Sequence, residues 1–240
     1  MCSISLWWLR SCLRRAFFGE LKAAAGSIVN ATSIAGPRVH PFAGSAYTTS
    51  KAALVVCIKQ VPGSAQIRVP PVTNTIMRQG VPTIINPYDL FALEAALELR
   101  DRFGGEIALL TIGPMSSEDS LRKALTFGAD RAILLSDRCF AGSDTLVTTY
   151  ALAAAIRKVG KEHGPPDFIF TGKQTIDGDT AQVGPGIAKR LGMLRLTYVG
   201  KIRALDPTVR TIETERRAEG GVQVLPTRLL RLITILEATN

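Results

Sequence analysis

The feature that most constrains the fold is an alternation of apolar, strand-like runs with helix-like segments that begins near residue 55. The predicted elements are strands at residues 55–60, 105–112, 131–136 and 167–171, and helices near residues 88–103, 116–127, 143–162 and 180–191. Such alternation is typical of a parallel sheet with helices on both faces. Four strand-like runs follow residue 195, with turns at Asp206-Pro207 and Gly220-Gly221. We therefore predict an α/β protein with a doubly wound parallel sheet and a more antiparallel C-terminal β region.

The connections that follow the parallel strands are where a ligand is expected. In doubly wound sheets the ligand crevice lies at the carboxyl ends of the strands. The loops in question are residues 57–62, 111–114, 137–145 and 172–183. The connection from the first strand to the first helix is too long for a simple βα loop, so it predicts a small β-excursion over this edge.

Composition excludes several classes of protein. The net charge is +9, but residues 1–54 hold six basic groups and one acidic group, which leaves only +4 on residues 55–240. Because that larger part has no basic stripe interleaved with aromatics, nucleic-acid binding is not predicted. No uncharged apolar run approaches the roughly 18 residues that span a bilayer. Four cysteines without a CxxC pair and only two histidines argue against a metal site and fit a reducing, cytoplasmic location.

Residues 1–54 differ in kind from the rest. Residues 1–19 are apolar and basic, which suggests either a poor targeting sequence or poorly ordered sequence upstream of a domain. In GSIVNATSIAG, a predicted strand, Ser33 lies 14 positions before Tyr47 of the predicted helix AYTTSKAALV. Tyr47 and Lys51 are spaced i,i+4 on one helical face, where an ammonium lowers the pKa of a phenol. Such a trio passes a proton to a substrate alkoxide.

This segment, about 35 residues long, resembles short-chain dehydrogenases/reductases. Nothing upstream of Gly19 supplies the Gly-rich dinucleotide loop which that family needs. We therefore expect residues 1–54 to be a foreign, catalytically inactive fragment and not an independent domain. The apolar run from Leu54 to Ile58 reads as a new first strand, so the boundary is predicted at residue 54. The alternative is a stand-alone reductase that uses Ser33, Tyr47 and Lys51.

The most informative loop is TGKQTIDGDTAQVGPGIAKRLG, residues 171–192. Gly172 lets the backbone approach a ligand closely, and Lys173 offers a cation. Asp179 or Thr180 is expected to cap the following helix, whose free amides form an anion site. Gln182 on the first turn can bond a phosphate or a ribose. Neither GxGxxG nor a P-loop is present, and a plain turn with a capped helix is the alternative.

Five blocks together resemble the beta subunit of electron transfer flavoproteins over residues 55–240. They are VVCIKQVP, INPYDLFALEAALELRD, LLTIGP, ALTFGADRAILLSDRCFAGSDTLVTTYALAAAI and GKQTIDGDTAQVGPGIAKRLG. The resemblance implies an adenine-nucleotide-hydrolase-like fold and a heterodimer with an alpha subunit. It further implies an electron carrier with no catalytic residues of its own, serving dehydrogenase or quinone-reductase partners.

The resemblance also implies that this subunit holds AMP, or FAD in the electron-bifurcating branch. The cofactor-binding residues implied by position are Cys57, Asn86, Pro87, Tyr88, Asp89, Ile112, Gly172, Lys173, Gln174, Thr175, Ile176, Asp177, Gly178, Asp179, Thr180, Ala181, Gln182 and Val183.

Three further expectations come from the same comparison with the family. The block SDRCFAGSDT is similar to the FAD-holding branch, in which the small residues Ala141, Gly142 and Ser143 make room for an isoalloxazine; an ordinary loop over AMP is the alternative. Family members continue for several dozen residues beyond Asn240, so the chain is expected to be truncated at its C-terminus. A nucleotide-binding module of universal-stress type is a further alternative that shares the fold but not the blocks.

Overall fold

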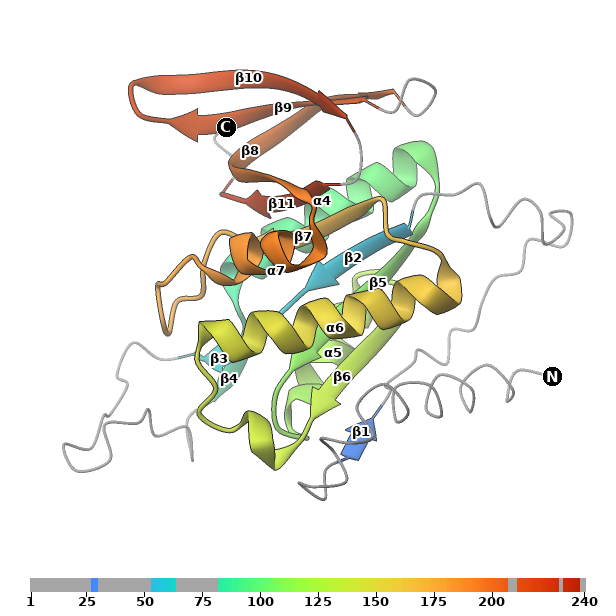
Figure 1. The fold of residues 1–240 in the computed structure, drawn as a ribbon, viewed down its shortest axis with the longest axis vertical. Helices are drawn as coiled ribbons and strands as arrows, with labels where there is room; N and C mark the ends of the chain where they lie inside the picture. The colour runs from blue at the N-terminus through green and yellow to red at the C-terminus, as the bar shows by residue number, and fades with distance from the viewer. Residues whose placement is uncertain (1–26, 30–52, 64–81, 207–210, 229–230, 238–240) are drawn as a thin grey trace, which may run out of the picture.

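The computed structural model describes residues 27–29, 53–63, 82–206, 211–228 and 231–237 (Figure 1). Its main sheet has nine strands in the order β1-β6-β5-β2-β7-β11-β8-β9-β10. The strand bounds are β1 Ser27–Val29, β2 Ala53–Cys57, β5 Glu106–Ile112, β6 Arg131–Ser136, β7 Phe168–Gly172, β8 Leu194–Asp206, β9 Thr211–Ala218, β10 Gly221–Arg228 and β11 Arg231–Ile235. The helices are α4 Pro87–Phe103, α5 Ser117–Thr126, α6 Thr145–His163 and α7 Val183–Leu191, with a 3-10 turn η1 at Arg138–Phe140.

The six central strands, from β6 to β8 in the sheet order, pair in parallel. Their sequences explain this arrangement, because β7 and β11 are buried at every position and β2 at four of five. A strand buried on both faces reads as a continuous apolar run, and only a sheet with helices on both sides offers such burial. The predicted parallel sheet is thus confirmed.

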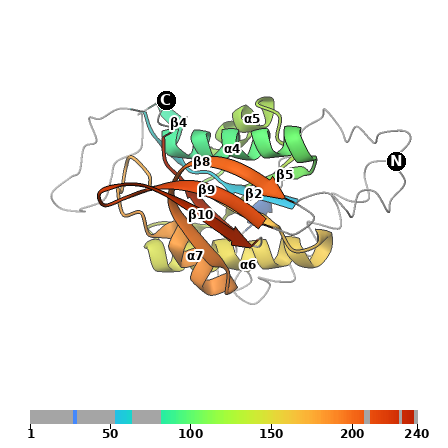
Figure 2. The same ribbon diagram turned by 90° about the horizontal axis from the view of Figure 1, so that it is seen from above.

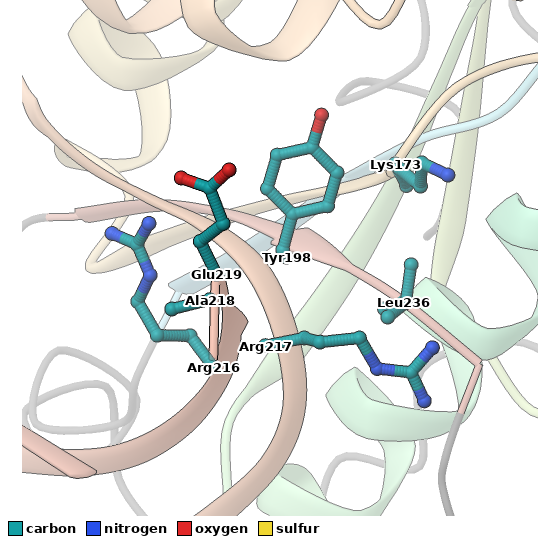
Figure 3. A pocket seen from close by; sticks show the side chains of 7 residues that line it. All are labelled: Lys173, Tyr198, Arg216, Arg217, Ala218, Glu219 and Leu236. Carbon is teal, nitrogen blue, oxygen red and sulfur yellow. The ribbon is translucent and has the colours of Figure 1, made fainter. Parts of the chain in front are cut away.

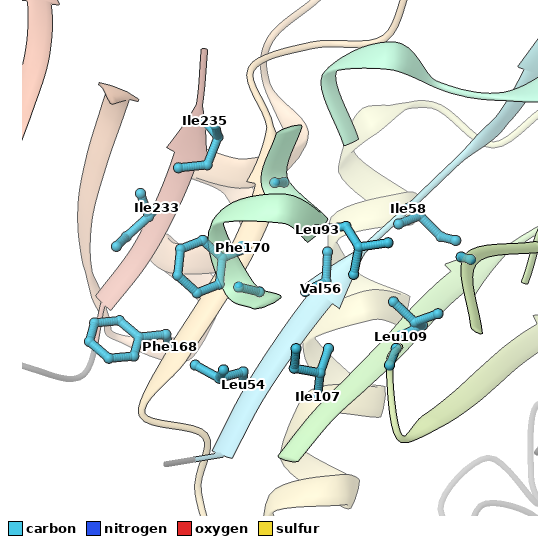
Figure 4. Packing of buried hydrophobic residues seen from close by; sticks show 14 of the residues in the cluster. Leu54, Val56, Ile58, Leu93, Ile107, Leu109, Phe168, Phe170, Ile233 and Ile235 are labelled. Atoms are coloured by element: carbon cyan, nitrogen blue, oxygen red, sulfur yellow. The ribbon is translucent and has the colours of Figure 1, made fainter. Parts of the chain in front are cut away.

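The helices form one layer on each face of the sheet. Figure 2 shows α4 and α5 on one side of the strands, and α6 and α7 on the other. Under α4 and α5 lies a core that includes Leu93, Ile107 and Phe170 (Figure 4). A second core under α6 and α7 includes Ile156 and Ile187. Each fully buried side chain of this kind contributes about 1.5–3 kcal/mol, so both faces stabilise the sheet.

The chain reverses its direction across the sheet between β2 and β7. From β2 it steps to β5 and β6; α6 then returns across the sheet and β7 lies on the other side of β2. In doubly wound folds, ligands bind at such a switch point, at the carboxyl ends of the strands. This is the doubly wound topology that the sequence predicted.

The C-terminal region is antiparallel in β8, β9 and β10, as expected, with a turn at Gly220, whose φ is 85°. The last run, residues 231–235, differs. It forms the parallel strand β11 between β7 and β8 and is buried throughout. Its sequence RLITI is apolar enough for a central strand, but no local pattern specifies its neighbours.

The β-excursion is confirmed as a two-stranded antiparallel sheet of β3 Gln60–Pro62 and β4 Thr83–Ile85. At the other end of the chain, β1 pairs antiparallel with β6. Ser33, Tyr47 and Lys51 of the reductase-like pattern lie outside the described residues. Among the residues that the structure describes, no helix is both long and apolar enough to cross a bilayer.

Candidate functional site

The start of α4 lies against the loop that follows β7, and Asn86 joins them. Asn86 is fully buried; its Nδ2 donates to the Gln174 carbonyl at 2.9 Å, and its Oδ1 accepts from the Ile176 amide at 3.2 Å. It occupies the N-cap position of α4, followed by Pro87 at N1, yet its side chain makes no capping bond. The side chain of Asn86 therefore fixes the β7–α7 loop instead of the helix end.

Asp89 performs a similar function one turn further along α4. Its Oδ2 accepts from the Lys59 amide at 2.8 Å and its Oδ1 from the Gly172 amide at 3.1 Å, so it links the ends of β2 and β7. Burial raises the pKa of the Asp89 carboxyl to about 7, although hydrogen bonds from Asn86, Lys59 and Gly172 and the charge of Lys59 act in the opposite direction. Because both carboxylate oxygens accept hydrogen bonds from backbone amides, Asp89 connects the start of α4 to the ends of β2 and β7.

Gly172 is required by this close packing. A Cβ at this position would lie 2.4 Å from Asp89 Oδ1 and 2.7 Å from the Tyr88 backbone carbon. Contacts below 3.0 Å are not sustained, so one element would have to move. The glycine thus permits the close approach expected from sequence, but to the chain's own helix α4.

A residue that sequence reasoning missed completes the loop's support. Lys59 Nζ pairs with both carboxylate oxygens of Asp177, at 2.7 and 2.9 Å, and the Asp177 side chain is only 2% exposed. The signal was available in the sequence, since Lys59 directly follows the first strand, in a loop expected at the crevice. The carboxylate of Asp177 is therefore engaged with the protein itself.

The middle of the loop has an unusual backbone. Asp179 and Ala181 have φ values of 48° and 53°, the left-handed region that favours glycine. Gln174 Nε2 donates to Asp179 Oδ1 at 2.6 Å, and Thr145 Oγ1 on α6 donates to Gln182 Oε1 at 2.7 Å. The predicted cap by Asp179 or Thr180 was wrong: the N-cap of α7 is Gln182, without a side-chain bond. The left-handed residues lead the chain past those positions before the helix begins.

The first turn of α7 packs tightly on the sheet. A Cβ at Gly184 would lie 2.7 Å from both Thr171 Oγ1 and Thr234 Cγ2. The Thr171 hydroxyl is buried and has no hydrogen-bond partner in the described part of the chain. The leading amides of a helix lack intrahelical acceptors, so α7 presents donors at the carboxyl edge of β7.

Cys57 and Ile112 end the strands β2 and β5. Burial, with the Asp89 charge as a smaller cause, raises the pKa of the Cys57 thiol to about 12. The thiol therefore stays protonated and behaves as a small apolar group. Cys57 belongs to the core on the α6 and α7 side, and the partly buried Ile112 packs against that core.

The sequence predicted that the Lys173 cation would serve a ligand at the β7–α7 loop, but the structure places it elsewhere. Its Nζ is 5.7 Å from the ring centroids of both Tyr88 and Tyr198, which places it between two aromatic faces. It also lines a cavity bounded by β8 and β9. Its side chain thus turns from the β7–α7 loop towards the antiparallel end of the sheet.

The α6 entry loop holds Ala141, Gly142 and Ser143, of which the first two are exposed. Asp144 caps α6 by accepting from the Val147 amide at 2.8 Å. No cluster of three or more His, Cys, Asp or Glu side chains within the described ranges has the spacing to hold a metal ion.

Comparison with known proteins supplies the context for this geometry. The electron transfer flavoprotein domain matches residues 73–240. Protein FixA of Bradyrhizobium diazoefficiens is 80% identical over 186 residues, which cover 78% of this chain and 65% of that protein. Protein FixA of Azorhizobium caulinodans is 78% identical over 78% of this chain and 66% of its own length. The electron transfer flavoprotein subunit beta of Clostridium acetobutylicum is 44% identical over 78% of this chain and 69% of its own length. The chain spans about two thirds of the length of these relatives.

Proposed function

Because the chain belongs to the electron transfer flavoprotein family and is similar to its beta subunits, we propose that it is an electron-carrier subunit holding AMP or FAD at the carboxyl ends of β2, β5 and β7. The observation that carries the proposal is the fixed β7–α7 loop. Asn86 holds it at two backbone positions and Lys59 holds it through Asp177. A loop held in this way is preorganised, so that a ligand can bind without the cost of ordering it.

The donor groups of this loop suit a phosphate. Left-handed residues, such as those at 179 and 181, are typical of backbone concavities that bind anions, and the free amides at the start of α7 add further donors. Pro185 in the first turn has no N–H to leave unsatisfied. Gln182 is held by Thr145, which orients its side-chain amide. We assign the phosphate-binding role to residues 178–183.

Fourteen of the eighteen residues implied by the family resemblance divide into two roles in this proposal. We assign direct contact with the nucleotide to Gln174, Thr175, Ile176 and residues 178–183. Cys57 and Ile112 would provide apolar surface beneath it. Asn86, Asp89 and Asp177 are assigned to positioning, because their polar atoms are engaged with the protein itself. When bound, a flavin would supply the electron-accepting chemistry, and the protein would bind, orient and shield it.

The partner and domain assignments follow the family as well. We propose that an alpha subunit completes a heterodimer, that dehydrogenases or quinone reductases exchange electrons with it, and that the chain is not an enzyme by itself. Residues 55–240 are proposed as the family domain; the 186 matched residues equal that segment in length. The reductase-like reading of residues 20–54 stays a prediction that a test for NADPH oxidation, with Tyr47→Phe as control, would decide.

The test is the nucleotide content of the chain co-expressed with its alpha partner. After acid denaturation, chromatography should release AMP or FAD in stoichiometric amount with the chain. Two FAD per heterodimer would identify the FAD-holding form that the Ala141–Ser143 segment suggests, and one FAD with one AMP would identify the AMP form. Protein free of both, and unable to bind either on titration, would contradict the proposal.

A charge variant sharpens this test. Gln182→Glu keeps the oxygen that accepts from Thr145 but places a negative charge at the proposed phosphate, so nucleotide affinity should fall roughly tenfold or more. Gln223→Glu makes the same charge change on β10, at an exposed position remote from the loop. Its affinity should match that of the wild type; equal losses in both variants would rule out the placement.

A further inference from the structure

A group of three cationic side chains, those of Lys173, Arg216 and Arg217, lies near the carboxyl ends of β7 and β11. It surrounds a cavity of about 330 Å³, within the size range of small-molecule sites (Figure 3). The lining residues come from β8, β9 and the segments after β7, β9 and β11: Tyr198, Arg216, Arg217, Ala218, Lys173, Glu219 and Leu236. Three of these side chains are cationic and one is anionic, so the lining has a positive balance.

The neighbouring acids do not neutralise this charge. Glu213 and Glu215 on β9 both pair with Arg203 on β8. Among the described residues, no ion pair reaches the guanidinium of Arg216 or of Arg217. Arg216 Nε is buried without a hydrogen-bond partner in the described chain. A buried donor in this condition needs an acceptor, and the described part of the chain does not supply one.

The backbone around the cavity is irregular. Tyr198 has a φ of 59°, and its amide donates to Thr234 Oγ1 at 3.2 Å. The pairing of β8 shifts register on both sides, between Val199 and Lys201 towards β9 and between Ile233 and Ile235 towards β11. Such bulges re-aim side chains, and here the Tyr198 ring meets the Lys173 ammonium. A strained non-glycine residue of this kind is typical of a ligand site.

We propose that this cavity binds a phosphate or pyrophosphate group of a small molecule. A guanidinium donates in a planar fork that matches phosphate oxygens, and an ammonium adds a point charge. The exposed ring of Tyr198 and the apolar Leu236 offer surface to the rest of the ligand. The volume suits a pyrophosphate or a phosphate monoester rather than a folded segment.

The site is separate from the proposed nucleotide loop but adjacent to it. Lys173 directly follows Gly172, and its amide donates to the Ile235 carbonyl at 2.9 Å, so its backbone is fixed on β11. Its side chain serves the cavity, whereas the residues after it form the loop. The inference therefore extends the proposed function but is measured independently of it.

The experiment is calorimetric titration of the full chain with inorganic pyrophosphate in a magnesium-free buffer. Arg216→Gln and Lys173→Met should each weaken binding at least tenfold, because each removes one of three charges. Glu219→Gln should tighten binding severalfold, because it removes the opposing carboxylate without deleting a ligand group. Arg195→Gln, an exposed arginine on β8 outside the cavity, should stay within twofold of the wild type. Unchanged affinity in the first two variants, or no tightening in Glu219→Gln, would overturn the proposal.

Competition then identifies the source of the phosphate. If neither AMP nor FAD displaces pyrophosphate, the cavity serves a separate phosphorylated ligand. If FAD displaces it and AMP does not, the cavity takes the second phosphate of a dinucleotide; both results support the site. Displacement by AMP would show that pyrophosphate sits in the nucleotide loop and would overturn the assignment. Pyrophosphate is titrated before any nucleotide is added. Its binding to the cavity can therefore be measured even if the chain binds neither AMP nor FAD.

Discussion

Substitution of Gly172 by alanine tests the central contact of the candidate site. The new Cβ would lie 2.4 Å from Asp89 Oδ1 and 2.7 Å from the carbonyl carbon and Cβ of Tyr88. Two of these three atoms belong to the first turn of α4 near its backbone, so rotation of a flexible side chain cannot relieve the overlap. The helix start must shift away from β7, which also strains the bond from the Gly172 amide to Asp89.

The magnitude follows from these two effects. Overpacking a tight interior typically costs about 1–3 kcal/mol. Loss of a hydrogen bond to a charged group costs about 1.5–3 kcal/mol. Because the shift that relieves the overlap weakens the bond only in part, we expect a loss of about 3 kcal/mol. In a chain of this size that corresponds to a fall in Tm of roughly 6–12 °C.

Urea unfolding followed by circular dichroism measures the loss, with Gly200→Ala as the matched control. Gly200 lies on β8, and a Cβ there would meet nothing within 4 Å. The control should remain within about 0.5 kcal/mol of the wild type, as is usual for a substitution that creates no new contact. If Gly172→Ala were as stable as the control, the close approach of α4 to β7 would be refuted.

Three further predictions use the groups around the loop. The pKa of the Asp89 carboxyl is raised from its ordinary value of 3.8 to about 7 in the folded chain. Its contribution to stability is therefore complete below about pH 4 and is lost as the pH rises to 7, by up to about 1.4 kcal/mol per pH unit. The unfolding free energy of Asp89→Asn across this range should lack that slope, and identical slopes in the variant and the wild type would contradict the prediction. Lys59→Met should destabilise the chain by about 1–2 kcal/mol more than Asp177→Asn in urea titrations. Lys59→Met leaves the charge of Asp177 on a side chain that is 2% exposed, whereas Asp177→Asn removes that charge. The reverse order of stability would show that the pair does not stabilise the loop. Alkylation of the native chain should label the exposed Cys139 but not Cys57, and peptide mass mapping would detect the labels. Cys57 should react only after urea unfolds the protein, because its thiol is buried and its pKa is raised to about 12. Labelling of Cys57 in the native chain would argue against its burial.

Much of the fold was predictable because the strands are buried on both faces. Continuous apolar runs such as the one ending at Cys57 report burial directly, and the intervening helices fall within a few residues of their predicted ends. The position of β11 was not predictable from local pattern. Its five residues read as a strand, but pairing with β7 and β8 depends on contacts more than 30 residues away along the chain.

The candidate site, like the fold, was predictable from the sequence only in part. The convergence of Asn86, Asp89 and the β7–α7 loop followed from the rule that strand ends meet at one edge, and the structure brings them together. Their individual partners did not follow, because a side chain's bond depends on distances between loops. Lys59 was missed for that reason, and the cap of α7 was placed two or three residues early because left-handed residues were not foreseen at non-glycine positions.

The location of β11 has a consequence for synthesis on the ribosome. The strand that fills the gap between β7 and β8 is made after both of them and after the whole β8–β10 meander. Until residues 231–235 leave the exit tunnel, β7 presents an open edge and Phe168 and Phe170 lack their neighbours Ile233 and Ile235. Until then the open edge of β7 can pair with strands of other chains, so the unfinished chain is more prone to aggregation than the complete one.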